Sequence, residues 1–106
     1  MEELKIEIKK LAEEELERAN EKFPLFHSDH EGLGVIEEEM FEVDVEWKCA
    51  KNFFDDFSID VFTDEEIGKI IDIQNIKESA INACAEMIQV IAMCDKFIDS
   101  RVERDE

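Results

Sequence analysis

The sequence is short of positive charge. It has 12 Lys and Arg residues against 30 Asp and Glu residues in a chain of 106, which gives a formal net charge of −18. A surface this acidic repels a phosphate backbone unless cations lie between the two. We therefore expect no direct binding to nucleic acid. The same charge favours divalent metal ions, or imitation of a nucleic acid toward a basic protein.

Cysteine is also scarce. The three cysteines, Cys49, Cys84 and Cys94, form no CxxC pair, and any disulfide would leave one of them unpaired. Two of them fall in an apolar helical run. We therefore predict reduced thiols in a core, which is typical of a cytoplasmic protein.

Long apolar runs and several common motifs are missing. The N-terminal segment MEELKIEIKK has no apolar signal-peptide core, and no uninterrupted apolar stretch approaches the length of a membrane span. We expect neither secretion nor membrane insertion. The sequence also lacks a Gly-rich phosphate loop, a dinucleotide fingerprint and a nucleophile paired with a base. Any chemistry is therefore expected to depend on a metal ion.

What the chain does have is apolar residues at helical spacing. Its length suits one domain, residues 1–106, and 44% hydrophobic residues are enough for one modest core. We predict an all-α fold, a small bundle of about four helices. The expected helices cover residues 2–22, ended by Pro24, and a second segment from near His30, capped by Ser28 or Asp29 and followed by a packed loop within residues 49–65. A short helix near 67–71, capped by Thr63 or Asp64, and a long one over 76–102 complete the set.

Two of these helices carry extensive apolar surface. In the second helix an apolar stripe is predicted to face a core, and it consists of Leu33, Ile36, Met40, Val43 and Trp47. The last helix is apolar around most of its circumference. That pattern is typical of a central bundle helix or of a subunit interface, so we expect the bundle to be completed by oligomerisation.

Glutamates gather along one border of the stripe. Glu39, Glu42 and Glu46 share this border, and Glu38 lies just beyond it. Like charges three or four residues apart repel by several tenths of a kcal/mol per pair, so we expect something to offset the repulsion. On the last helix a narrow polar strip interrupts the apolar surface, and it contains Asn82, Glu86, Gln89 and Lys96.

These two features meet if the second and last helices pack side by side. Glu38, Glu39 and Glu42 would then face Glu86 and Gln89. Oxygen ligands of this kind select hard cations such as Mg²⁺ or Mn²⁺. Such an ion would cancel the repulsion and hold a phosphate group and a water. The alternative is that the glutamates form a solvated helix face, which is common in acidic chains.

The same residues resemble a known family. The run EEEMFE, preceded by HSDHEG and followed downstream by EMIQVIAMCDKFID, is similar to the phage-type, MazG-like members of the all-α nucleotide pyrophosphohydrolase superfamily. The resemblance covers roughly residues 23–50 and 78–99. It implies Mg²⁺-dependent or Mn²⁺-dependent cleavage of a nucleoside triphosphate to a monophosphate and pyrophosphate. It also implies a homodimer or homotetramer in the cytoplasm of a bacterial or phage-infected cell.

The resemblance assigns roles to single residues. It implies Glu38 and Glu39 as catalytic residues, metal ligation by Glu39, Glu42 and Glu86, and nucleotide contacts by Lys96, Gln89 and Asn82. Gln89 stands where the wider superfamily has an aspartate. Three alternatives therefore stay open: a hydrolase, a nucleotide-binding protein that sequesters its ligand without turnover, and an acidic inhibitor that imitates DNA.

Overall fold

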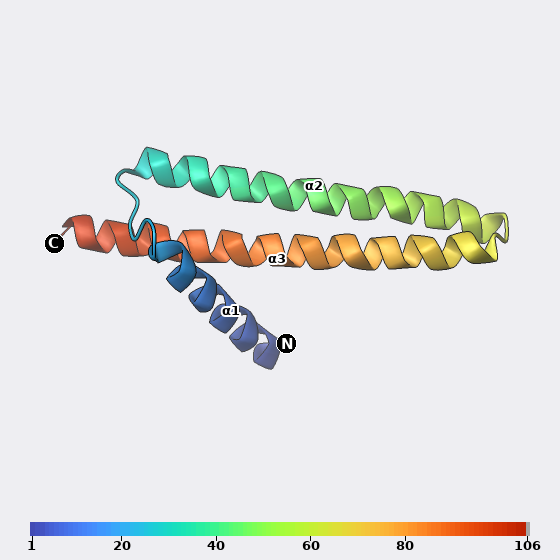
Figure 1. Ribbon diagram of the computed structural model, residues 1–106, viewed down its shortest axis with the longest axis horizontal. Helices are drawn as coiled ribbons and strands as arrows, with labels where there is room; N and C mark the ends of the chain where they lie inside the picture. The colour runs from blue at the N-terminus through green and yellow to red at the C-terminus, as the bar shows by residue number, and fades with distance from the viewer. Residues whose placement is uncertain (106) are drawn as a thin grey trace. The chain divides into compact units, whose positions relative to one another are not determined.

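The computed structural model describes residues 1–105, with side chains to residue 102, and these residues form three α-helices (Figure 1). They are α1 (Glu2–Asn20), α2 (Asp29–Phe62) and α3 (Glu66–Asp105). No strand occurs within the described part of the chain, so the all-α prediction is confirmed. The structure has three helices in its described residues where about four were expected. Residues 49–62 continue α2, and the two helices expected near 67–71 and over 76–102 form the single helix α3. No described helix combines the length and hydropathy that a membrane crossing requires.

The chain divides into two compact units. The first unit contains Met1–Met40 and the chain from Glu86 onward, and the second unit is Phe41–Ala85. The first therefore holds α1, the beginning of α2 and the C-terminal part of α3. The second is a helical hairpin made from the end of α2 and the beginning of α3.

The core of the first unit surrounds the connection between α1 and α2. Phe26, Ala92 and Met93 are buried there, and the residues packed against them are Leu16, Ala19, Val35, Ile36 and Phe97. A Cβ on Gly32 would lie 2.7 Å from Cδ2 of Phe97, so only glycine lets α2 approach this ring so closely. The predicted cap at Ser28 is confirmed, because its Oγ accepts a hydrogen bond from the Glu31 N–H at 3.1 Å.

The hairpin of the second unit turns through a left-handed residue. Asp64 has φ 57°, and the N–H of Glu65 donates to the carbonyl of Asp60 at 2.9 Å. The N–H of Asp64 donates to the carbonyl of Val61, which completes a Schellman-type end of α2. Asp64 therefore ends α2, in contrast to its expected role as a cap of the following helix.

Many residues expected in a core are exposed instead. Leu33, Met40 and Trp47 are 62%, 54% and 47% exposed, so the prediction that the whole stripe of α2 is buried is wrong. All three cysteines are free and exposed, which also corrects the prediction of core thiols. In α3 small and polar residues are buried, while the exposed positions include large aliphatic ones; the buried set includes Ser79, Ala83, Ala92 and Ser100, and the exposed set includes Ile81, Met87 and Ile98.

Candidate functional site

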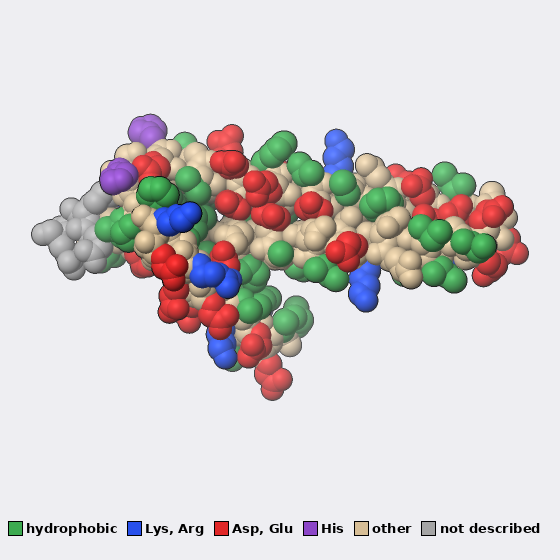
Figure 2. All heavy atoms as spheres, viewed as in Figure 1, with side chains coloured by type: hydrophobic (Ala, Val, Ile, Leu, Met, Phe, Trp, Pro, Cys, Tyr) green, Lys and Arg blue, Asp and Glu red, His purple; other side chains and the backbone are tan. Residues whose placement is uncertain are grey.

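Three of the predicted metal ligands lie close together. Glu39 and Glu86 belong to the first unit, and each offers a carboxylate oxygen within 4.8 Å of the other. Glu42 follows Glu39 by three residues in α2, and their carboxylate oxygens lie within the same distance. We call Glu39, Glu42 and Glu86 the carboxylate group. Figure 2 shows acidic side chains, in red, at many places on the visible face of the molecule.

The position of the carboxylate group follows from helix geometry. Residues three apart lie on one side of an α-helix, so Glu39 and Glu42 project from adjacent turns of α2. Glu39 and Glu86 are half-buried. A partly buried carboxylate is less well hydrated and its charge is less screened, so the repulsion within the group exceeds that of glutamates on an open surface.

The donor set of the carboxylate group suits a hard divalent cation. Oxygen ligands of one Mg²⁺ at about 2.1 Å lie at most about 4.2 Å apart, so a small rotamer change would bring these oxygens to bonding positions. Such an ion, held by three carboxylates, would still have room for water and phosphate oxygens. The residues present therefore fit Mg²⁺ or Mn²⁺ by number, charge and spacing.

Glu38 is not part of the carboxylate group. Its side chain is exposed, and one residue of helix rotation separates it from Glu39 by about 100°. Of Glu38 and Glu39, the two predicted catalytic residues, only Glu39 belongs to the carboxylate group.

Gln89 contacts α1. Its side chain forms a hydrogen bond with Glu15 of α1, and this bond is the main reason why the pKa of Glu15 is lowered from its usual value. An ion pair between Glu15 and Arg18 acts in the same direction. The Gln89 amide therefore has a partner on α1, which no spacing within α3 could reveal.

Asn82 and Lys96 also have partners of their own. In the second unit, Nδ2 of Asn82 donates to Oε2 of Glu46 at 3.4 Å. In the first unit, Lys96 is only 5% exposed, and its Nζ lies 5.0 Å from the centre of the Phe26 ring. Burial lowers the pKa of Lys96, and the charge of Glu31 acts in the opposite direction. Ten residues of α3 separate Lys96 from Glu86, which is about 15 Å along a helix.

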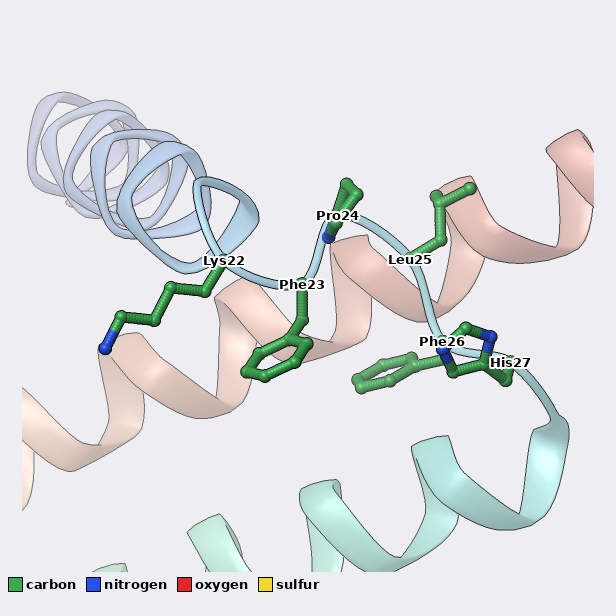
Figure 3. A pocket seen from close by; sticks show the side chains of 6 residues that line it. All are labelled: Lys22, Phe23, Pro24, Leu25, Phe26 and His27. Carbon is green, nitrogen blue, oxygen red and sulfur yellow. The ribbon is translucent and has the colours of Figure 1, made fainter.

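A hollow on the connection between α1 and α2 had no counterpart in the sequence pattern. It has a volume of about 470 Å³ and is lined by residues 22–27. Figure 3 shows the rings of Phe23 and Phe26 on this segment and the Lys22 ammonium directed away from them. The signal that could have indicated this place is the run FPLFH after α1, where two aromatic residues flank a helix-ending proline.

Comparison of the chain with family models, with curated proteins and with solved structures finds no match.

Proposed function

We propose that the chain is a Mg²⁺-dependent or Mn²⁺-dependent nucleoside triphosphate pyrophosphohydrolase that releases a nucleoside monophosphate and pyrophosphate. The observation that carries the proposal is the carboxylate group, in which Glu39, Glu42 and Glu86 offer oxygen ligands at a spacing close to that of one hard cation. The resemblance of residues 23–50 and 78–99 to MazG-like proteins supports the same function.

The carboxylate group has a defined part in this reaction. When bound, Mg²⁺ supplies charge neutralisation for the triphosphate and increases the acidity of bound water. Glu39, Glu42 and Glu86 would hold the ion, and the Glu39 carboxylate would also orient a water toward the phosphate. Glu38 is exposed and turned away from Glu39, so it is the weaker of the two candidates for the catalytic base.

The proposal includes a homodimer or homotetramer. Stable interfaces bury about 800 Å² on each partner, and the core of such a patch is rich in apolar side chains. The exposed aliphatic residues of α3, which include Ile81, Met87 and Ile98, would supply apolar contact area. Sedimentation at micromolar concentration should show a dimer or tetramer, and a stable monomer would contradict this part.

A second candidate is a nucleotide-binding protein without turnover. It is favoured by Gln89, whose side chain is hydrogen-bonded to Glu15 and is neutral where the resembling superfamily has an acidic ligand. With only three carboxylates the ion would be held less tightly, and the water less strongly activated.

Pyrophosphate release separates the two candidates. A panel of nucleoside and deoxynucleoside triphosphates should be incubated with the chain and Mg²⁺ or Mn²⁺, and pyrophosphate measured. Glu39→Gln and Glu86→Gln should each abolish release, because each removes one carboxylate of the group. Glu37→Gln is the matched control, since Glu37 is a glutamate of the same helix outside the carboxylate group and should tolerate the change.

Thermal unfolding tests the metal site independently of activity. An ion at 100 times its dissociation constant adds about 2.7 kcal/mol to stability. The parent and Glu37→Gln should gain this stability with Mg²⁺, and Glu39→Gln and Glu86→Gln should not. A gain in all four proteins would place the ion elsewhere. Nucleotide binding and a normal metal response without hydrolysis would favour the second candidate.

A further inference from the structure

A second meeting of acidic side chains lies in the second unit, near the hairpin turn. Asp60 is close to the end of α2, and its carboxylate packs against the backbone of Gly68 in α3. A Cβ on Gly68 would meet the carboxylate oxygens of Asp60 well inside contact distance. The missing side chain at residue 68 therefore makes the space that Asp60 occupies.

Asp72 lies one turn beyond Gly68 on the same side of α3. It is only 8% exposed, and its Oδ2 is buried and accepts no hydrogen bond from an N–H or hydroxyl donor of the described residues. Its carboxyl group faces that of Asp60, which is the main cause of the raised pKa of Asp72. Two carboxyl groups can form a hydrogen bond with each other only when one of them carries the proton.

No cation among the described residues offsets the charge of this pair. The charged groups that face Asp72 are Asp60 and Asp56, both from α2. Lys69 of α3 binds Asp64 and Glu66 in the turn instead. The hydrogen bond with Asp60, burial, and the charges of Asp60 and Asp56 raise the pKa of Asp72 to about 6.

A proton fits this place better than a metal ion. Asp56 does not join Asp60 and Asp72 as a third ligand, because no such set of three converging oxygens is found there among the described residues. Two carboxylates in contact are neutralised to a single charge by one proton, as in the paired carboxyl groups of acid proteases.

We propose that Asp60 and Asp72 share one proton and form a pH-sensitive latch that joins α2 to α3 beside the hairpin turn. With the proton in place, Asp72 donates to Asp60 across the two helices. Without it, two adjacent carboxylates repel each other in a place where water screens them poorly. The latch is independent of the function proposed for the carboxylate group.

The direction of the pH effect follows from the two states of Asp72. Its pKa is 3.8 without the protein environment and about 6 in the fold, so the folded chain holds the proton more tightly. The stabilising contribution is therefore complete below about pH 4 and is lost as the pH rises through about 6. Above that range the deprotonated pair weakens the hairpin.

Substitution by asparagine tests the latch directly. Asp72→Asn places a permanent amide donor beside Asp60 and so imitates the protonated state, and Asp60→Asn removes the other carboxylate. Thermal unfolding of the full chain should be followed from about pH 4 to about pH 8 with a chelator present. Asp55→Asn is the matched control, because Asp55 is an exposed aspartate of the same helix as Asp60 and its loss removes the same charge.

The expected result is a smaller fall in Tm between about pH 4 and pH 7 for Asp60→Asn and Asp72→Asn than for the parent and for Asp55→Asn. Above about pH 7 the two variants should melt at a higher temperature than Asp55→Asn. Equal slopes in all four proteins would overturn the proposal.

Carboxyl ¹³C NMR of the parent gives a second measurement that does not depend on a variant. One of the two carboxyl groups should titrate near pH 6. Titration of both groups at their ordinary pKa would overturn the latch. The latch would also be overturned if Mg²⁺ raised Tm at about pH 8 and this increase were lost in Asp60→Asn but kept in Glu86→Gln. The pair would then hold a cation.

Discussion

The hydroxyl group of Ser100 links α3 to the segment before α2, and its removal should be costly. Ser100 is fully buried. Its Oγ accepts a hydrogen bond from the N–H of Phe26 at 2.8 Å and donates one to the carbonyl of Lys96 at 2.7 Å. Phe26 is part of the core of the first unit, so this bond fixes the entry of the chain into α2.

The size of the effect can be worked out from these bonds. In Ser100→Ala the carbonyl of Lys96 retains its helical hydrogen bond, but the N–H of Phe26 is left buried without a partner. An unsatisfied buried donor costs about 1–3 kcal/mol, and we expect a loss of about 2 kcal/mol. For a chain of this length that corresponds to a decrease in Tm of roughly 10 °C.

Urea unfolding followed by circular dichroism is the appropriate assay, with equal slopes checked between variants. The control is Ser79→Ala, which removes another buried serine hydroxyl from α3 and leaves the bonds of Ser100 intact. It should cost less than Ser100→Ala. If Ser100→Ala loses under about 0.5 kcal/mol, or no more than Ser79→Ala, then water satisfies the Phe26 N–H and the reasoning fails.

Three further substitutions test other contacts. Asp64→Gly should raise Tm by a few degrees, because glycine adopts the φ of 57° without strain and the exposed ion pair with Lys69 contributes little. Thermal unfolding checks this, with Asp64→Ala as the comparison variant that should lower Tm. Lys96→Met should preserve or raise Tm at neutral pH, because it removes a buried charge. The gain should be smaller at alkaline pH, where the buried ammonium of the parent loses its proton. An increase in KM for nucleotide would instead support a phosphate contact of Lys96. Gln89→Asp should tighten Mg²⁺ binding but lower Tm without metal, because it replaces the donor to Glu15 with a repelling carboxylate. Calorimetry measures the metal binding and thermal unfolding measures Tm. The second substitution Glu15→Gln should restore Tm.

Local signals in the sequence were sufficient for the beginning of the chain. The first helix was expected to cover residues 2–22 and to end before Pro24, and α1 ends at Asn20, two residues earlier. Ser28 or Asp29 was expected to cap the second helix, and the Oγ of Ser28 does so. Each of these signals acts through the backbone within one turn, so it needs no knowledge of distant packing.

The length of the other helices was underestimated. Residues 49–65 showed no helical period and were assigned partly to a loop, yet α2 continues to Phe62. Residues 49–62 contain no glycine or proline, so no residue of this stretch ends the helix before the left-handed Asp64. The spacing of apolar residues shows which face of a helix is buried. A helix whose apolar residues lie on several sides has no clear apolar period, even when its backbone is a regular α-helix.

The choice of buried face could not be made from the sequence. Residues 76–102 were expected to form a helix that is apolar around most of its circumference, and that pattern does not indicate which side is buried. The structure buries small residues such as Ala83 and Ala92, and it leaves Ile81 exposed. Small side chains let two helices approach closely, and that preference depends on the partner helix. For the same reason the contact between Gln89 and Glu15 required the position of α1.

The two groups of acidic side chains pose one physical problem with different solutions. In the carboxylate group three side chains converge, and one proton would still leave two negative charges among them, so a divalent cation is the more effective counterion. Asp60 and Asp72 are only two, and a single proton both reduces their charge and forms a hydrogen bond. The stability of the chain should therefore respond to Mg²⁺ through Glu86 and to pH near 6 through Asp72. Glu86→Gln should remove the first response and retain the second, and Asp72→Asn should do the reverse. Loss of both responses in either variant would mean that the two groups are coupled and would contradict the separate roles assigned to them.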